Sequence, residues 1–183
     1  AGNIEAADEI SIYEGTITAG GTIQTTSSYS PHTIYIYGGN VTAASIESLS
    51  NLFIGESFDT YGLNDKILIN LTGDMVASYN ITIYGGDINV GGAIETTDNE
   101  GNTINIYGGY IDAGSIDSAT DIYVGDQEDY YETNSEIFIN AGSITAAYNL
   151  QIYAGIIHAE TVYANNLFDI YNDAVLFDAQ LTE

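Results

Sequence analysis

The chain has 183 residues, of which 26 are Asp or Glu and only Lys66 is a strong base, so the formal net charge at pH 7 is −25. Phosphate backbones and anionic lipids repel such a chain, which argues against nucleic acid and anionic membranes as partners. Hydrophobic residues make up 45% of the sequence, a composition unlike that of disordered segments. No apolar run reaches the length that spans a bilayer, so we expect no membrane insertion.

One sequence motif recurs along the chain: two apolar residues two positions apart, a glycine turn, and then further apolar residues. It is clearest from Ile104 to Ile116 and occurs earlier from Ile34 to Ile46. Alternation with a period of two predicts strands, and the glycines predict tight bends between them. Full copies begin at Ile10, Ile34, Ile81, Ile104, Leu150 and Phe168, and shorter or interrupted copies begin at Leu52, Ile67, Ile122 and Ile137.

A repeat of this length predicts a solenoid, because a short strand with one apolar face buries that face only by stacking on the next copy. We therefore expect an all-β, single-domain parallel β-helix (β-solenoid) of about ten short coils over residues 1–183. Right-handed coiling is expected, as for most parallel crossovers. Either the short coils that begin at Leu52, Ile67, Ile122 and Ile137 are flattened, or the segments at Leu52 and Ile122 belong to larger, irregular coils.

A second period of about seventy residues lies over the first, since Asn70 recurs as Asn140 and most other positions from Ile34 onward recur likewise. This super-repeat indicates duplication. It divides the chain into modules of about residues 10–80, 81–149 and, in part, 150–183, with loop insertions at 55–66 and 125–136. The residue three positions after each start follows the order Tyr, Tyr, Gly, Asn: Tyr13, Tyr37, Gly55, Asn70, Tyr84, Tyr107, Gly125, Asn140, Tyr153 and Tyr171.

The phrase Ile-x-Ile-x-Gly-Gly-x-Val/Ile-x-Ala covers the chain from Ile4 to Leu181 and resembles the parallel β-helix repeats of bacterial and archaeal cell-surface and adhesin-like proteins. The resemblance implies the architecture and leaves the function open, because such repeats serve adhesins, surface layers and polymers. A chain rich in Tyr, Asn, Thr and Gly with almost no Lys or Arg favours an extracellular or cell-surface location. It begins without Met, so we expect a mature chain whose targeting segment has been removed.

Both ends of the chain fall at the same stage of a coil. Ile4 precedes Ile10 as Val162 precedes Phe168, and the last coil stops near its third strand. Neither end shows a cap, and an uncapped solenoid end is an open sheet edge around an apolar core. Such ends favour head-to-tail stacking into a filament; alternatively, the chain is a fragment of a longer solenoid. The expected assembly interface consists of Ile4, Ile10, Ile12, Phe168, Ile170, Val175, Phe177 and Leu181.

Large apolar residues also recur at the outward position next to several starts. They are Tyr35, Phe53, Leu68, Tyr123 and Phe138. An exposed apolar patch of this kind usually marks an interface, so we expect a lateral contact with a neighbouring subunit unless the two insertions cover it.

Features that suggest chemistry are few. The chain has no Arg, and His32 and His158 are isolated, so we expect no enzyme. Acidic residues that can bind Ca²⁺ cluster in two loops, where a solvated acidic surface is the alternative: Asp98 and Glu100, and Asp126, Glu128, Asp129 and Glu132. Sequons for N-glycosylation begin at Asn40, Asn70 and Asn80, a number that chance also produces.

Two hypotheses follow from the sequence. The first is a structural subunit of a self-assembling extracellular filament or sheath, a homopolymer that needs no cofactor. The second is an adhesin-like module that binds glycans or other surfaces through the insertions at 55–66 and 125–136 or through a tyrosine-bearing face. The first depends on the terminal residues, and the second on the loops.

Overall fold

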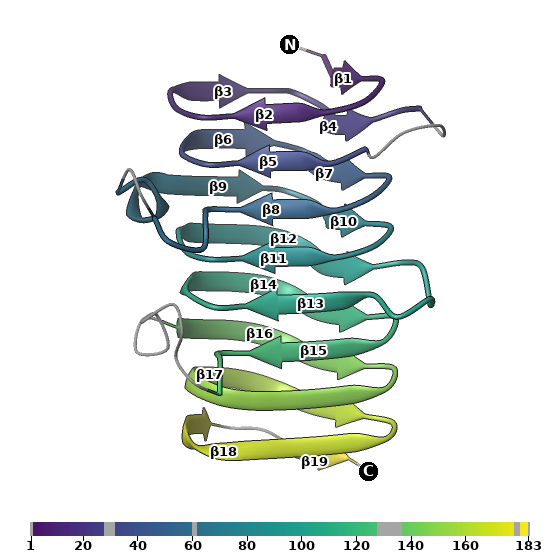
Figure 1. Cartoon of the computed structure of the whole chain (residues 1–183), viewed down its shortest axis with the longest axis vertical. Coiled ribbons are helices and arrows are strands. Elements are labelled where there is room, and N and C mark those ends of the chain that lie inside the picture. The colour runs from purple at the N-terminus through teal and green to yellow at the C-terminus, as the bar shows by residue number, and fades with distance from the viewer. Residues whose placement is uncertain (1, 28–31, 60–61, 128–136, 178–179, 183) are drawn as a thin grey trace.

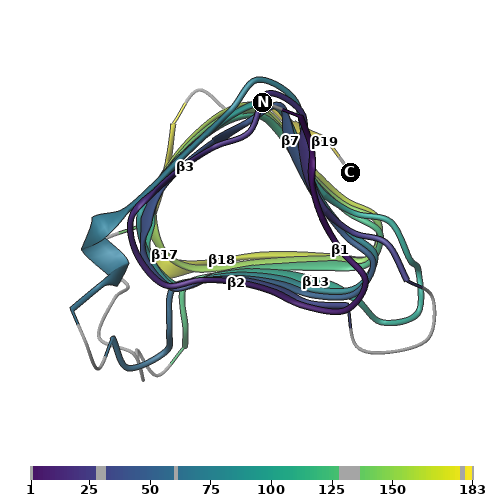
Figure 2. The same ribbon diagram turned by 90° about the horizontal axis from the view of Figure 1, so that it is seen from above.

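The structure is a computed structural model that describes residues 2–27, 32–59, 62–127, 137–177 and 180–182, without the side chains of 172, 173, 177 and 180–182. In these ranges the chain winds into a parallel β-helix, which confirms the predicted fold (Figure 1). Seen from above, the coils form a rounded triangle (Figure 2). The chain turns clockwise as it recedes from the N-terminus, so the helix is right-handed.

Three faces, here named A, B and C in chain order within a coil, form the triangle, and the strands on each face pair in parallel. Face A consists of β2 (Ile10–Ile12), β5 (Ile34–Ile36), β8 (Leu52–Ile54), β11 (Ile81–Ile83), β13 (Thr103–Ile106), β15 (Asp121–Val124) and the first parts of β17 (Asn149–Ala164) and β18 (Leu167–Phe177).

Face B begins with three separate strands and continues in longer strands that bend from one face to the next. It consists of β3 (Thr16–Thr18), β6 (Gly39–Ala43), β9 (Ile67–Leu71), the first halves of β12 (Asp87–Thr96), β14 (Gly109–Ser118) and β16 (Ile137–Ala146), and later parts of β17 and β18. Face C consists of β1 (Ile4–Ala6), β4 (Thr22–Thr25), β7 (Ser45–Ser48), β10 (Met75–Ala77), the second halves of β12, β14 and β16, the end of β17, and β19 (Gln180–Thr182).

The described strands make eight complete coils preceded by β1, rather than about ten. Ile67 and Ile137 do not begin coils: they pair with Gly39 and Gly109 on face B. Leu52 and Ile122 therefore open large coils in which the two insertions separate face A from face B, and the flattened alternative is wrong. The pattern of alternating apolar residues recurs on more than one face, so periodicity alone does not reveal where a coil begins.

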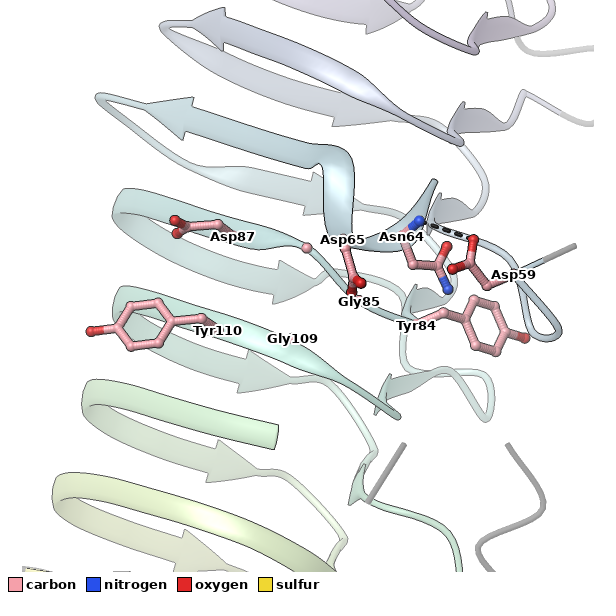
Figure 3. A pocket seen from close by; sticks show the side chains of 9 residues that line it. Asp59, Asn64, Asp65, Tyr84, Gly85, Asp87, Gly109 and Tyr110 are labelled. Carbon is pink, nitrogen blue, oxygen red and sulfur yellow. Dashed lines mark hydrogen bonds between the residues drawn. The ribbon is translucent and has the colours of Figure 1, made fainter. Parts of the chain in front are cut away.

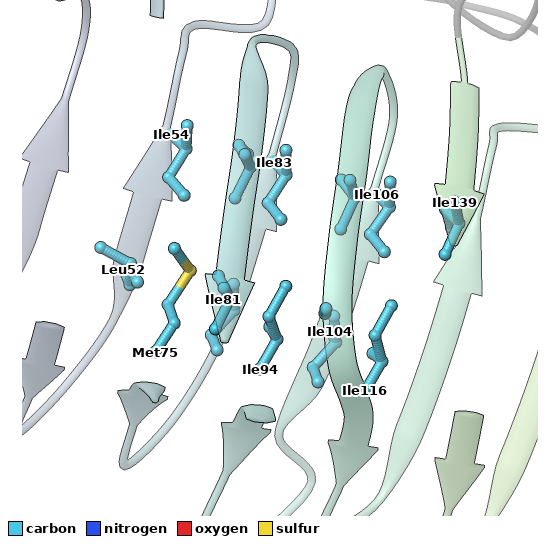
Figure 4. Close-up of a cluster of buried hydrophobic side chains, with 14 of the residues drawn as sticks. Leu52, Ile54, Met75, Ile81, Ile83, Ile94, Ile104, Ile106, Ile116 and Ile139 are labelled. Atoms are coloured by element: carbon cyan, nitrogen blue, oxygen red, sulfur yellow. The ribbon is translucent and has the colours of Figure 1, made fainter. Parts of the chain in front are cut away.

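The core consists of inward side chains stacked in columns along the solenoid axis (Figure 4). On face A, Ile81 lies opposite Ile104 and Ile83 opposite Ile106, and all four are fully buried. The only methionine, Met75, continues a face C column. Full burial of each such side chain contributes about 1.5–3 kcal/mol, so these columns are the main source of stability.

The corner between faces A and B explains the glycine turns. Gly39 and Gly109 have φ angles of +95° and +102°, which side chains with a Cβ rarely adopt. A Cβ on Gly39 would lie 2.6 Å from the carbonyl oxygen of Gly15, and a Cβ on Gly109 would lie 2.7 Å from that of Gly86. Neighbouring coils approach too closely here for any larger residue.

A column of tyrosines stands at the same corner. Gly55 and Gly125 interrupt it where the two insertions leave the solenoid, so the order Tyr, Tyr, Gly repeats every three coils and accounts for the super-repeat. Asn70 and Asn140 lie on face B instead. The stacked pairs, with ring centroids 5.0, 5.4 and 4.5 Å apart, are Tyr13 with Tyr37, Tyr84 with Tyr107, and Tyr153 with Tyr171.

Candidate functional site: the terminal coils and the outer faces

The last coil exposes part of the apolar core. Ile170 pairs with Ile152 in the same column, yet its side chain is 44% exposed whereas that of Ile152 is 1% exposed. Phe168 and Leu176 are only partly buried against the core. Because β18 pairs with β17 on one side alone among the described strands, its other edge offers backbone hydrogen-bonding groups to another strand.

Val175, which the sequence pattern assigns to the core, lies outside it. Ile152 pairs with Ile170, but Ala154 pairs with Asp173, so β18 contains one extra residue at this point. This bulge moves Leu176 opposite the buried Ile157, and Val175 opposite the exposed Ile156. A shift of one residue exchanges the two sides of a strand, which makes Leu176 the terminal core residue of face B.

The first coil is open in the same way. Ile4 is 37% exposed, and its partner Ile23 is fully buried. Ile10 and Ile17 are partly buried against the core, while Ile12 is nearly covered. The terminal residues that the sequence predicts therefore divide into exposed and covered members.

Two further members of the predicted interface are described by their backbone alone. Phe177 pairs with His158 and Leu181 with Val162, but the side chains of Phe177 and Leu181 lie outside the described part of the structure. The pairing of Leu181 places the last strand on face C, the face that also holds β1.

The predicted lateral patch is not one surface. Tyr35 and Phe53 stack on face A with ring centroids 5.3 Å apart. Tyr123 lies on the same face, but Thr82 and Asn105 occupy the coils between. Leu68 and Phe138 lie on face B.

The structure instead brings together an apolar column on the outside of face B, which we name the face B ridge. It is made of Tyr110, Phe138, Ile156 and Val175, which pair with one another on four successive coils. Tyr110, Ile156 and Val175 are exposed, and the rings of Tyr110 and Phe138 stack at 4.8 Å. Of the four members, the sequence predicts only Phe138 as part of an outward apolar patch, because the spacing between members varies with loop length and with the bulge in β18.

The first insertion forms a hollow of about 470 Å³ beside face B, shown in Figure 3. The carboxylate of Asp59 accepts hydrogen bonds from the backbone N–H groups of Leu63 and Asn64, at 2.6 and 3.0 Å, and so fixes the short 3₁₀-helix Asn64–Lys66. Asp65, Asp87 and the exposed Tyr110 also line the hollow. Carboxylates beside aromatic rings give it polar acceptors and apolar platforms.

Among the described residues, which include the first predicted calcium loop but only Asp126 of the second, no group of three or more His, Asp or Glu side chains can hold a metal ion. In the first loop, the carboxylate of Asp98 accepts the backbone N–H of Glu100 at 3.2 Å. Asp126 is described, whereas Glu128, Asp129 and Glu132 lie outside the described residues.

The three sequon asparagines have different surroundings. The amide nitrogen of Asn80 donates to Asn51 at 3.0 Å, and its side-chain oxygen accepts the backbone N–H of Thr103 at 2.8 Å, so both ends of this amide bind residues of neighbouring coils. The side-chain oxygen of Asn40 is buried. Asn70 lies half-buried on face B.

Carboxylates oppose one another on the outside of face C. Glu95 pairs directly with Asp117, and Asp74 lies one coil away. Partial burial, followed by the charges of Asp74 and Asp117, raises the pKa of Glu95 above its ordinary value. Burial likewise raises the pKa of Tyr37 and Tyr153 in the tyrosine column, so these hydroxyls stay neutral at physiological pH.

These features define a parallel β-helix protein with an apolar ridge on one outer face. No protein-family model, curated protein or solved structure matches the chain. Within the described ranges, no helix is long and apolar enough to cross a bilayer.

Proposed function

We propose that this protein is a structural, non-enzymatic subunit of an extracellular filament or sheath that polymerises by head-to-tail stacking of its terminal coils. The observation that carries the proposal is that residues of the core columns are exposed in both terminal coils, at Ile170 and Ile4, while their inner neighbours are buried. Covering them with the end of another copy removes apolar surface from water. The edge strands gain backbone partners at the same time.

Such stacking joins two different surfaces, and repetition of a heterologous contact produces a filament rather than a closed ring. Eight coils at a strand spacing of ~4.8 Å give an axial rise of about 38 Å for each subunit. Both terminal coils carry carboxylates, so repulsion between subunits opposes assembly at low salt.

The test is negative-stain electron microscopy and sedimentation of the purified chain, with two aspartate variants that differ only in position. Ile170→Asp places a carboxylate on the exposed core of the last coil, whereas Ile156→Asp places one on the face B ridge. The two isoleucines are 44% and 43% exposed. We expect filaments from the unmodified chain and from Ile156→Asp, and separate short rods from Ile170→Asp with unchanged β-sheet circular dichroism. Filaments from Ile170→Asp would refute end stacking.

A second candidate function is glycan binding of the adhesin type, which the hollow beside the first insertion favours. Asp65, Asp87 and Tyr110 there combine hydrogen-bond acceptors with an exposed ring. Titration with neutral oligosaccharides, compared between the unmodified chain and Tyr110→Ala, tests this function. If the chain stays in short rods and binds a glycan through Tyr110, glycan binding replaces the filament as the proposed function.

A further inference from the structure

The three faces hold unequal numbers of strands, and this affects how two copies can stack. In the described ranges, face A and face B each contain eight strands. Face C contains nine, because β1 adds one before the first coil and β19 ends the last. When copies stack with like faces joined, each copy occupies the same length along the axis on all three faces. At a common strand spacing, nine strands on face C do not fit into the length that eight strands occupy on faces A and B.

We propose, on the basis of the filament function above, that the β19 of one copy takes the place of β1 on face C of the next copy, so that polymerisation displaces β1. If the first strands of faces A and B in one copy pair directly with the last strands in another, the partner's β19 reaches the level occupied by β1. Both then compete for β4, whose Ile23, Gln24 and Thr25 pair with Ile4, Glu5 and Ala6 in the separate chain.

The tyrosine column favours this stack, in which like faces meet. Tyr171 is 37% exposed and stacks on Tyr153, while Tyr13 is 64% exposed and stacks on Tyr37. Joining face A to face A brings Tyr13 of one copy to Tyr171 of the other and continues the column. The alternative keeps β1 in place by turning each copy one third of a turn. In that arrangement Tyr171 would lie against the corner between faces C and A of the next copy, which contains Asp8 and Glu9. No ring stack would continue there.

β1 is held weakly enough on β4 to be displaced. It has only three residues, and Ile4 and Glu5 are exposed. It pairs with β4 alone among the described strands, supported by Gln24 donating to the carboxylate of Glu5 at 2.9 Å. The incoming β19 replaces its three backbone pairs, so the exchange conserves hydrogen bonds on face C while faces A and B gain new ones.

The test fixes β1 to β4 with a reducible bridge. The chain has no cysteine, so the double variant Glu5→Cys/Gln24→Cys carries one thiol pair, at outward positions that lie opposite each other. The control, Glu47→Cys/Val76→Cys, places the same pair between β7 and β10 of face C, away from the ends. Both pairs are closed with a mild oxidant, which joins the two thiols in a disulfide that a reductant opens again.

We expect the closed Glu5–Gln24 bridge to raise the critical concentration for filaments at least tenfold, reduction to restore it, and the control to polymerise in both states. Equal polymerisation of the closed and reduced forms would overturn the exchange and leave the filament function standing, as would a rotation of one third of a turn per subunit in a helical reconstruction. If the reduced variants and the unmodified chain form no filaments, the proposed function fails and the exchange fails with it.

Discussion

Replacing Gly109 by alanine tests the physical reason for the glycine turns. Gly109 has a φ of +102°, and an added Cβ would lie 2.7 Å from the carbonyl oxygen of Gly86. That oxygen accepts the backbone N–H of Tyr110 at 2.8 Å, so the coils cannot separate without weakening a ladder bond. The left-handed backbone costs a residue with a Cβ about 1–2 kcal/mol, and forced overpacking adds about 1–3 kcal/mol. We therefore expect Gly109→Ala to lower the free energy of unfolding by about 2–5 kcal/mol.

The matched control is Gly101→Ala. Gly101 has a φ of +79°, but a Cβ added there would meet no atom within 4 Å, so only the backbone term of about 1–2 kcal/mol remains. Urea unfolding followed by circular dichroism measures both variants, with the denaturant slope as a check on the compactness of the unfolded chain. Equal losses at the two positions would show that the close approach of coils is not what requires glycine.

Two further predictions concern charge. Glu95→Gln should raise the free energy of unfolding by about 0.5 kcal/mol at pH 7, because it removes a like-charge pair. The pKa of Glu95 is raised in the folded chain, so its ionisation destabilises the fold as the pH rises through that pKa, and the gain should vanish in acid, where Glu95 is protonated. Glu47→Gln, which faces neutral residues, should have little effect in the same unfolding experiment, and a pH-independent gain at Glu95 would contradict this reasoning. Raising salt from about 0.05 to about 0.5 M should lower the critical concentration for filaments, since it screens carboxylates such as Glu14 and Asp169; light scattering that falls with salt would contradict it.

The strands and turns of this protein can be predicted from its sequence because they depend on residues close together in the chain. Alternation with a period of two identifies strands such as Ile104–Ile106 without further information, because an apolar side chain at every second position is what a half-buried strand requires. The glycine turns can likewise be predicted from a few neighbouring residues. Stacking follows from both, since no single coil can bury its own apolar face.

The assignment of strands to faces required the tertiary structure. Ile67 carries the same pattern as Leu52, yet one lies on face B and the other on face A, separated by an insertion. The bulge in β18 had the same effect at one residue, exchanging the roles of Val175 and Leu176. Alternation of apolar residues reveals neither the face on which a strand lies nor the bulge, because the partner of each strand lies in another coil.

The sequence by itself therefore determined the strands, the turns and the stacking of coils, all of which depend on residues close together in the chain. The tertiary structure alone decided that Ile67 and Ile137 lie on face B rather than at the start of coils, and that the face B ridge unites Tyr110, Phe138 and Ile156. These features depend on register between distant strands, which loop lengths and a single bulged residue set. The terminal core residues from which assembly is proposed belong to the first group, except that the bulge in β18 puts Leu176 in the place of Val175.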